Sequence, residues 1–386
     1  MFEFKPDYEQ KKKRIEAFWE RELIDRPVVQ FHLTKPLEEW VPLPTSQHTT
    51  PADRWLDAEY QAELALASLS NQEFLGDSLP VAHPNLGPEV FSAFYGCTIE
   101  FGDYGTSWTS PILHDWGDAD RLRFDWNSPY LAKLHEMTDA LLAVGAGRFI
   151  VGMTDWHPGG DAIAAFRDPQ QLALDMIDHT EEVRALLARV EADYFRVYDM
   201  FYEKLRAAGQ PITSWTRLLW DGRYYIPSND FSCMVSKAMF DDLFLPGIVN
   251  ECRFLERSIY HLDGPGALRH LDSLLAIPEL NAIQWVPGAG REEFYRWIPV
   301  FRKVQAAGKG LQVNCRFTEI DQVIETLDPH GLYLAVGGVP SREAAEALLK
   351  KLEQWSAARS QGSGAKGQEP GARSCARPSP AGACTW

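Results

Sequence analysis

The segment RSIYHLDGPG (257–266) decides how the fold is interpreted, because it shows a buried strand ending in polar side chains. Its apolar run, which favours a β-strand, stops at His261 and Asp263, and a glycine–proline turn follows. Side chains alternate along a strand, so His261 and Asp263 must point to the same face. The pair could therefore form a strand-end site for a metal or a substrate. The alternative is a capped turn, in which Asp263 accepts hydrogen bonds from backbone N–H groups of the glycine loop.

Similar short apolar runs recur along the chain and alternate with amphipathic helical patterns. The expected strands are residues 26–33, 147–155, 211–220, 257–263, 281–287, 310–317 and 331–338. The main helical patterns are 168–209, 236–257, 292–308, 318–327 and 341–355. Repeated strand–helix units predict an α/β protein with a mostly parallel sheet and outer helices.

One further strand is expected within 70–110, which brings the count close to eight. We therefore predict a (β/α)8 TIM barrel that forms a single domain over 1–355. A doubly wound open sheet is the alternative, but no G-x-G-x-x-G motif follows the first strand. Residues 356–386 are rich in Gly, Ala, Ser, Pro and Arg, so we expect a disordered tail there. The composition of this tail also resembles out-of-frame translation of GC-rich DNA.

Composition narrows the classes of partner. The 386-residue chain carries a net charge of −16, and its one basic run is KKKR at 11–14, so we expect no nucleic-acid partner. It has no apolar run of roughly 18 residues, so we expect no membrane span. The charged N-terminus lacks an apolar signal segment, which indicates a cytoplasmic protein. The six cysteines form no CxxC pair and are expected to be reduced thiols.

In a TIM barrel the active-site groups lie at the C-terminal ends of the strands. The ends of the expected strands carry His32, Asp155, His157, Arg217, His261, Asp263, Trp285 and Arg316. We assign Asp155 and His157 as an acid–base pair. His261 and Asp263 are expected to polarise or coordinate the ligand.

Further side chains are expected to bind a small-molecule substrate. These are Arg217, Trp215, Trp285, Trp108, Asp77, His83, Asp230 and Arg316. Arg217 suits a carboxylate, and the tryptophans suit the walls around a flat or cyclic ligand. Asp77 and His83 fall in a Gly/Pro-rich rim loop (74–96), whereas Asp230 is either a ligand contact or a helix N-cap.

Three segments resemble the C-terminal half of the uroporphyrinogen decarboxylase superfamily. They are SKAMFDDLFLPGIVNECRFLERSIYHLDGPG (236–266), NAIQWVPGAG (281–290) and LAVGGVPSREAAEALL (334–349). This superfamily of (β/α)8 barrels includes the decarboxylase and the zinc-dependent corrinoid:coenzyme M methyltransferases. The resemblance implies methyl transfer with a corrinoid protein as partner, or a decarboxylase-like lyase reaction. The alternative is a non-catalytic barrel that binds a tetrapyrrole, a corrinoid partner or a sugar-like ligand.

The chain departs from the family where the chemistry is carried. The arginine-rich motif of the decarboxylase has no counterpart in PVVQFHLTKPLEEW (27–40), so we expect no activity on uroporphyrinogen. In the methyltransferase H-x-C motif His261 matches the histidine, but Asp263 stands at the first cysteine and Gly337 at the second. Zinc would therefore have to bind through His261 and Asp263 without the thiolates of the family. Strand alternation points Cys315 away from His261.

Overall fold

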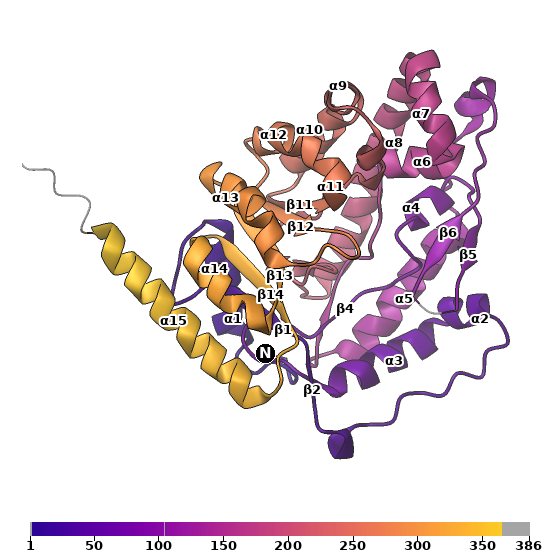
Figure 1. Ribbon diagram of the computed structural model, residues 1–386. Helices are drawn as coiled ribbons and strands as arrows, with labels where there is room; N and C mark the ends of the chain where they lie inside the picture. The colour runs from indigo at the N-terminus through magenta and orange to yellow at the C-terminus, as the bar shows by residue number, and fades with distance from the viewer. Residues whose placement is uncertain (1, 104, 365–386) are drawn as a thin grey trace, which may run out of the picture.

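The computed structural model describes residues 2–103 and 105–364, and its centre is a curled parallel sheet (Figure 1). Within the described residues this sheet has six strands in the order β1-β14-β13-β12-β11-β10. Its strands are β1 (Val28–Phe31), β10 (Tyr224–Tyr225), β11 (Arg257–Asp263), β12 (Ala282–Val286), β13 (Gly310–Arg316) and β14 (Leu332–Gly337). The carboxyl ends of parallel strands share one edge, which brings the end of β11 beside the ends of β12 to β14.

Helices surround this sheet, with α12, α13 and α14 outside the strands (Figure 1). The α-helices are α1 (Tyr8–Trp19), α2 (Pro51–Leu56), α3 (Ala58–Ser70), α4 (Val90–Ala93), α5 (Pro129–Gly145), α6 (Gly160–Arg167), α7 (Pro169–Asp178), α8 (Thr180–Ala207), α9 (Lys237–Met239), α10 (Leu245–Phe254), α11 (Gly264–Ala267), α12 (Leu271–Leu275), α13 (Ile298–Ala306), α14 (Ile320–Thr326) and α15 (Arg342–Gly364). None of them, within the part of the chain that is described, is long and apolar enough to cross a membrane.

Shorter strand pairs occupy the chain between β1 and β10. They are β2 (Leu33–Thr34) with β3 (Gln72–Glu73), β4 (Val81–Ala82) with β7 (Ile150–Val151), β5 (Ile99–Phe101) with β6 (Ser107–Thr109), and β8 (Ile212–Thr213) with β9 (Leu219–Trp220). Backbone hydrogen bonds link some of these segments to one another and to the sheet. Asp77 N donates to Val29 O and Met153 N donates to Thr213 O, both at 2.8 Å. The protein is thus an α/β fold consistent with a TIM-like barrel, and the described residues do not show a closed eight-stranded barrel.

The segment 211–220, expected as one strand, is instead the antiparallel hairpin β8–β9. Its tip lies inside the curl of the sheet, where Tyr333 of β14 donates its hydroxyl to Thr216 O at 3.0 Å. Gln30 of β1 donates its side-chain amide to Arg217 O, also at 3.0 Å. Arg217 itself has φ +56°, a left-handed conformation that non-glycine residues seldom adopt. The chain reverses here because inward polar groups of the sheet bind the carbonyls of the tip.

The last helix extends beyond the expected domain boundary at 355. α15 continues to Gly364, and Ser356 is fully buried. Trp355 and Leu352 anchor this stretch in the core, and the Ala and Arg residues that follow favour helix. The expected disorder therefore does not hold at the start of 356–386, and residues 365–386 lie outside the described part of the chain.

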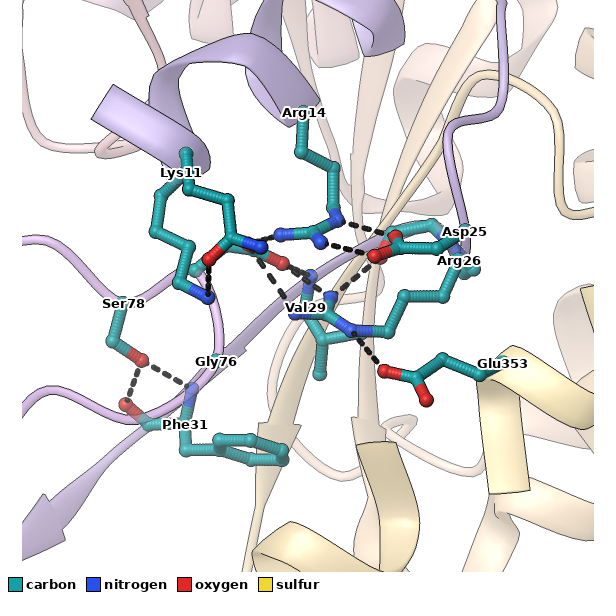
Figure 2. A network of polar contacts seen from close by, with 12 residues as sticks. Lys11, Arg14, Asp25, Arg26, Val29, Phe31, Gly76, Ser78 and Glu353 are labelled. Carbon is teal, nitrogen blue, oxygen red and sulfur yellow. Dashed lines mark hydrogen bonds and ion pairs between the residues drawn. The ribbon is translucent and has the colours of Figure 1, made fainter. Parts of the chain in front are cut away.

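Asp77, expected to bind substrate, is instead buried in an ion-pair network at the other end of β1 (Figure 2). Its carboxylate pairs with Arg14 of α1 and with Arg26, and it accepts the Val29 N–H at 2.9 Å. Arg14 also pairs with Asp25. Two guanidiniums neutralise one fully buried carboxylate here, so Asp77 joins α1 to the sheet and is not available to a ligand.

Replacing Asp77 tests this structural role. Asp77→Asn keeps the shape of the side chain but leaves Arg26 without a buried counter-charge. Removing one partner of a buried ion pair costs about 3 kcal/mol or more, so we expect the free energy of unfolding to fall by about that amount. Urea denaturation measures it.

Glu353→Gln is the matched control, because Glu353 lies 4.0 Å from Arg26 and is 47% exposed. A half-exposed pair at that distance contributes within about 0.5 kcal/mol. Equal stabilities for the two variants would contradict the role given to Asp77.

Candidate active site

Two adjoining cavities open at the carboxyl ends of the strands. The lumen cavity, about 710 Å³, lies inside the curled sheet. Its polar lining includes Gln30, Arg217, Gln284, Gln312, Asn314, Arg316 and Tyr333. The acidic cavity, about 580 Å³, is lined by Glu89, Asp155, His157, Asp161, Asp230 and His261, among others. Trp215 lines both cavities, so a ligand in one can reach the other past a single indole ring.

His157 lies between two carboxylates in the acidic cavity. Its Nε2 is 3.2 Å from Asp155 Oδ1, and its Nδ1 is 3.4 Å from Asp161 Oδ2. Burial opposes the charged imidazolium, but the contacts with Asp155 and Asp161 outweigh it and raise the pKa of His157 well above its ordinary value. Burial likewise opposes ionisation of Asp155, yet His157, His83 and His261 lower its pKa overall. The pair is therefore an imidazolium and a carboxylate near neutral pH.

Asp161 fixes the position of a second carboxylate. It accepts the backbone N–H groups of Asp230 at 3.0 Å and of Phe231 at 2.8 Å, where the short helix η3 (Asp230–Met234) begins. Asp230 thereby lies between the histidines, with 3.8 Å from its carboxylate both to His157 Nδ1 and to His261 Nε2. Burial and the neighbouring Asp161 raise the pKa of Asp230 to about 6.

Asp230, His261 and Asp263 form a cluster that can hold a metal ion. One donor atom from each lies within 4.8 Å of the others. His261 Nδ1 is 2.7 Å from Gln284 Oε1, which makes Nδ1 the donor and leaves the Nε2 lone pair free for a ligand. The side chain of Asp263 makes no capping hydrogen bond to α11. The alternative in which Asp263 only caps the glycine turn therefore does not explain its position. One imidazole and two carboxylates suit zinc or another divalent first-row metal.

The cysteines near the cluster do not take the place of the zinc-binding thiolates of the family that the sequence resembles. Burial raises the pKa of the Cys315 thiol to about 12, so this cysteine stays protonated. Cys233, which the sequence gave no reason to single out, lines the acidic cavity on η3. Its partial burial and the carboxylates of Asp230 and Asp263 raise the pKa of its thiol. The oxygen and nitrogen donors are thus the ready ligands of the cluster.

Arg217 and Arg316 lie in the lumen cavity, as a substrate-binding role requires. Arg217 reaches it from the hairpin tip, and Arg316 ends β13. The carboxylates of Glu292 and Glu319 line the same cavity. The two guanidiniums can bind an anionic group on the ligand, although these carboxylates offset part of their charge.

Three other expected substrate contacts line neither cavity, although His83 is near enough to Asp155 to lower the pKa of that carboxyl. Trp285 is 2% exposed and packs 4.8 Å from the ring of Trp297, because Gln284 and Val286 take the inward positions of β12. Trp108 is an outlying residue of β6, 47% exposed, and donates to Glu100 at 3.2 Å. His83 faces a separate cavity of about 150 Å³ beside α3 and α5, and burial lowers its pKa.

Comparison with solved structures agrees with the class that the fold defines, an α/β, TIM-like protein. No family model matches the chain, and no curated protein matches it. Among solved structures, a methyltransferase from Methanosarcina mazei superposes with a TM-score of 0.54 over 89% of this chain and 98% of its own. The two are 13% identical, so the likeness concerns the fold.

Variants of the strand end test the metal cluster. Asp263→Asn keeps size but removes the charge, and His261→Ala removes the imidazole. We expect each to weaken zinc binding at least tenfold, about 1.4 kcal/mol, and to leave the melting temperature of the metal-free protein nearly unchanged. Because both groups hold one ion, the double variant should be far from additive. Isothermal titration with zinc measures all three.

His330→Ala is the control, because His330 forms a comparable pair with Asp328, 2.7 Å apart, on the surface. It should bind zinc like the wild type. Normal zinc affinity in both strand-end variants, together with early melting, would mean that His261 and Asp263 serve only the turn.

Proposed function

We propose that the protein is an enzyme that transfers a methyl group to or from a small organic substrate at the carboxyl ends of its strands. The observation that carries this proposal is the cluster of Asp230, His261 and Asp263, which adjoins a cavity lined by Arg217 and Arg316. The methyltransferase-like fold supports the reaction class. The family resemblance favours a corrinoid protein as the partner that carries the methyl group.

The residues of the cluster would hold a divalent metal ion, most naturally zinc. When bound, such an ion supplies Lewis-acid activation of a substrate heteroatom. Gln284 orients the His261 ring through its 2.7 Å contact with Nδ1. Asp230 accepts or releases a proton near its raised pKa of about 6 when no metal holds it. His157 keeps its proton because Asp155 and Asp161 flank its two ring nitrogens.

The lumen cavity would bind the non-reacting part of the substrate. Arg217 and Arg316 suit a carboxylate, sulfonate or phosphate group, because a guanidinium donates to two oxygens at once. The cavity volume of about 710 Å³ fits a small molecule of ordinary metabolite size. Trp215 would then separate the anchored end from the reacting end.

A decarboxylase-like lyase reaction is the second candidate. Loss of CO2 leaves an electron pair on carbon that a nearby acid must protonate. The raised pKa of His157 provides that acid beside a cavity whose arginines bind carboxylates. The two candidates use the same substrate anchor and differ in whether the metal cluster is needed.

A methyl-transfer assay separates them. The zinc-loaded protein is incubated with methylcobalamin and small thiols, alcohols and amines, each with and without an anionic group. Loss of methylcobalamin absorbance and mass spectrometry of the methylated product report transfer. We expect transfer to an anionic acceptor, abolished by His261→Ala. Failure with every acceptor, together with CO2 release from a small carboxylic acid, would favour the lyase.

Arg217→Gly removes the proposed substrate anchor and should change the stability of the protein little. The left-handed conformation of Arg217 costs about 1 kcal/mol, which glycine avoids, while the flexibility of glycine costs a similar amount. We therefore expect a nearly unchanged melting temperature and an approximately tenfold higher KM for the anionic acceptor.

Arg21→Gly is the matched control, because Arg21 also has a left-handed φ, +55°, and lines neither cavity. Its KM should equal that of the wild type. An unchanged KM in Arg217→Gly would show that Arg217 does not anchor the substrate.

A further inference from the structure

A third cavity, the rear cavity, lies behind the acidic cavity and has a volume of about 210 Å³. It is enclosed by α8, by the π-helix η4 (Phe240–Phe244) with α10, and by the loops 158–160 and 228–229. Within α-helices, π-turns are rare and occur often at functional sites. The polar side chains that line the cavity include Glu191, Tyr194, Asn229 and Glu251.

Each of these four side chains has an oxygen atom without a hydrogen-bond partner among the described residues. The atoms are Glu191 Oε1, Tyr194 OH, Asn229 Oδ1 and Glu251 Oε2. Tyr194, Asn229 and Glu251 are 0%, 4% and 6% exposed. A buried polar atom without a partner costs free energy, and native proteins rarely leave several around one cavity. Such a concentration favours a polar occupant, either water or a cation.

The donors of the rear cavity are all oxygen, and two of them are carboxyl groups. Burial raises the pKa of both Glu191 and Glu251, and the Glu191 and Asp161 carboxylates add to the effect at Glu251. Water can satisfy a hydroxyl, an amide or a neutral carboxyl, whereas a bound cation would favour loss of the proton from each glutamic acid and would balance the charge that results. Arg184 lines the same cavity, yet it is paired with Asp242, 3.0 Å away.

We propose that the rear cavity binds a hard metal cation, of the Ca²⁺ or Mg²⁺ type, through the oxygens of Glu191, Tyr194, Asn229 and Glu251. Carboxylate and amide oxygens are ligands such cations prefer, the Tyr194 hydroxyl would add a further neutral oxygen, and nitrogen and sulfur donors would favour other metals. The volume leaves room for the water molecules that complete their coordination. This site is distinct from the cluster of Asp230, His261 and Asp263.

The position of the rear cavity links it to the candidate active site. Loop 158–160 follows His157 directly, and Asn229 precedes Asp230. Gly160 permits the close approach of these two loops, since a Cβ there would lie 2.8 Å from the Asn229 amide. A cation held by Asn229 and by the helices behind it would brace the segment that carries Asp230.

Cation titration of the full chain tests the proposal. His261→Ala serves as the background, so that the front cluster does not contribute, and the protein is first stripped with a chelator. We expect isothermal titration to show one Ca²⁺ or Mg²⁺ ion bound per chain, with a higher melting temperature. Adding Glu251→Gln should weaken binding at least tenfold. The glutamine replaces a neutral acid of the same shape, so the fold should persist.

Glu279→Gln is the control, because Glu279 sits on the surface in a pair with Arg253 and should bind cations like its parent. Unchanged affinity in Glu251→Gln, or a thermal shift that KCl at equal ionic strength reproduces, would overturn the proposal. If circular dichroism shows that Glu251→Gln does not fold, Tyr194→Phe, which removes only the hydroxyl, replaces it. Several-fold weaker binding is then expected, and unchanged affinity would overturn the site.

Discussion

The candidate active site depends on one contact, the pair of backbone hydrogen bonds that Asp161 accepts from Asp230 and Phe231. These bonds tie the start of α6 to the start of η3 across 69 residues of sequence. They hold Asp230 between His157 and His261. In this way they connect the pair of Asp155 and His157 to the cluster that can hold a metal ion. The same carboxylate stays beside His157, so one side chain both builds the site and tunes its charge.

The fold was predictable where the strands are long and buried. β11 has the bounds expected from the sequence, and β12, β13 and β14 differ from expectation by about one residue at their ends. These strands are short, partly apolar segments between helical patterns, and repeated units of that kind indicate a parallel sheet. The hairpin within 211–220 was not predictable, because its reversal occurs at Arg217, in a left-handed conformation, without a glycine to mark it.

The site was predictable where one strand carries it. The spacing of His261 and Asp263 places both on one face of β11, and they do belong to one cluster. The pairing of Asp230 with them depends on Asp161, and nothing local in the sequence links those positions. Trp285 packs against Trp297 because the alternation of side chains along β12 turns it away from the lumen cavity. The buried position of Asp77 depends on arginine partners from α1 and from the segment just before β1, which no local pattern around Asp77 indicates.

The central claim is that Asp230, His261 and Asp263 bind one metal ion. Anomalous diffraction at the zinc edge, from crystals of the protein grown with zinc, tests it most directly. The account predicts a single strong anomalous peak within coordination distance of the His261 Nε2 atom and the two carboxylates. A peak on Cys233 or Cys315 instead, or density for a water molecule alone between the three side chains, would contradict it.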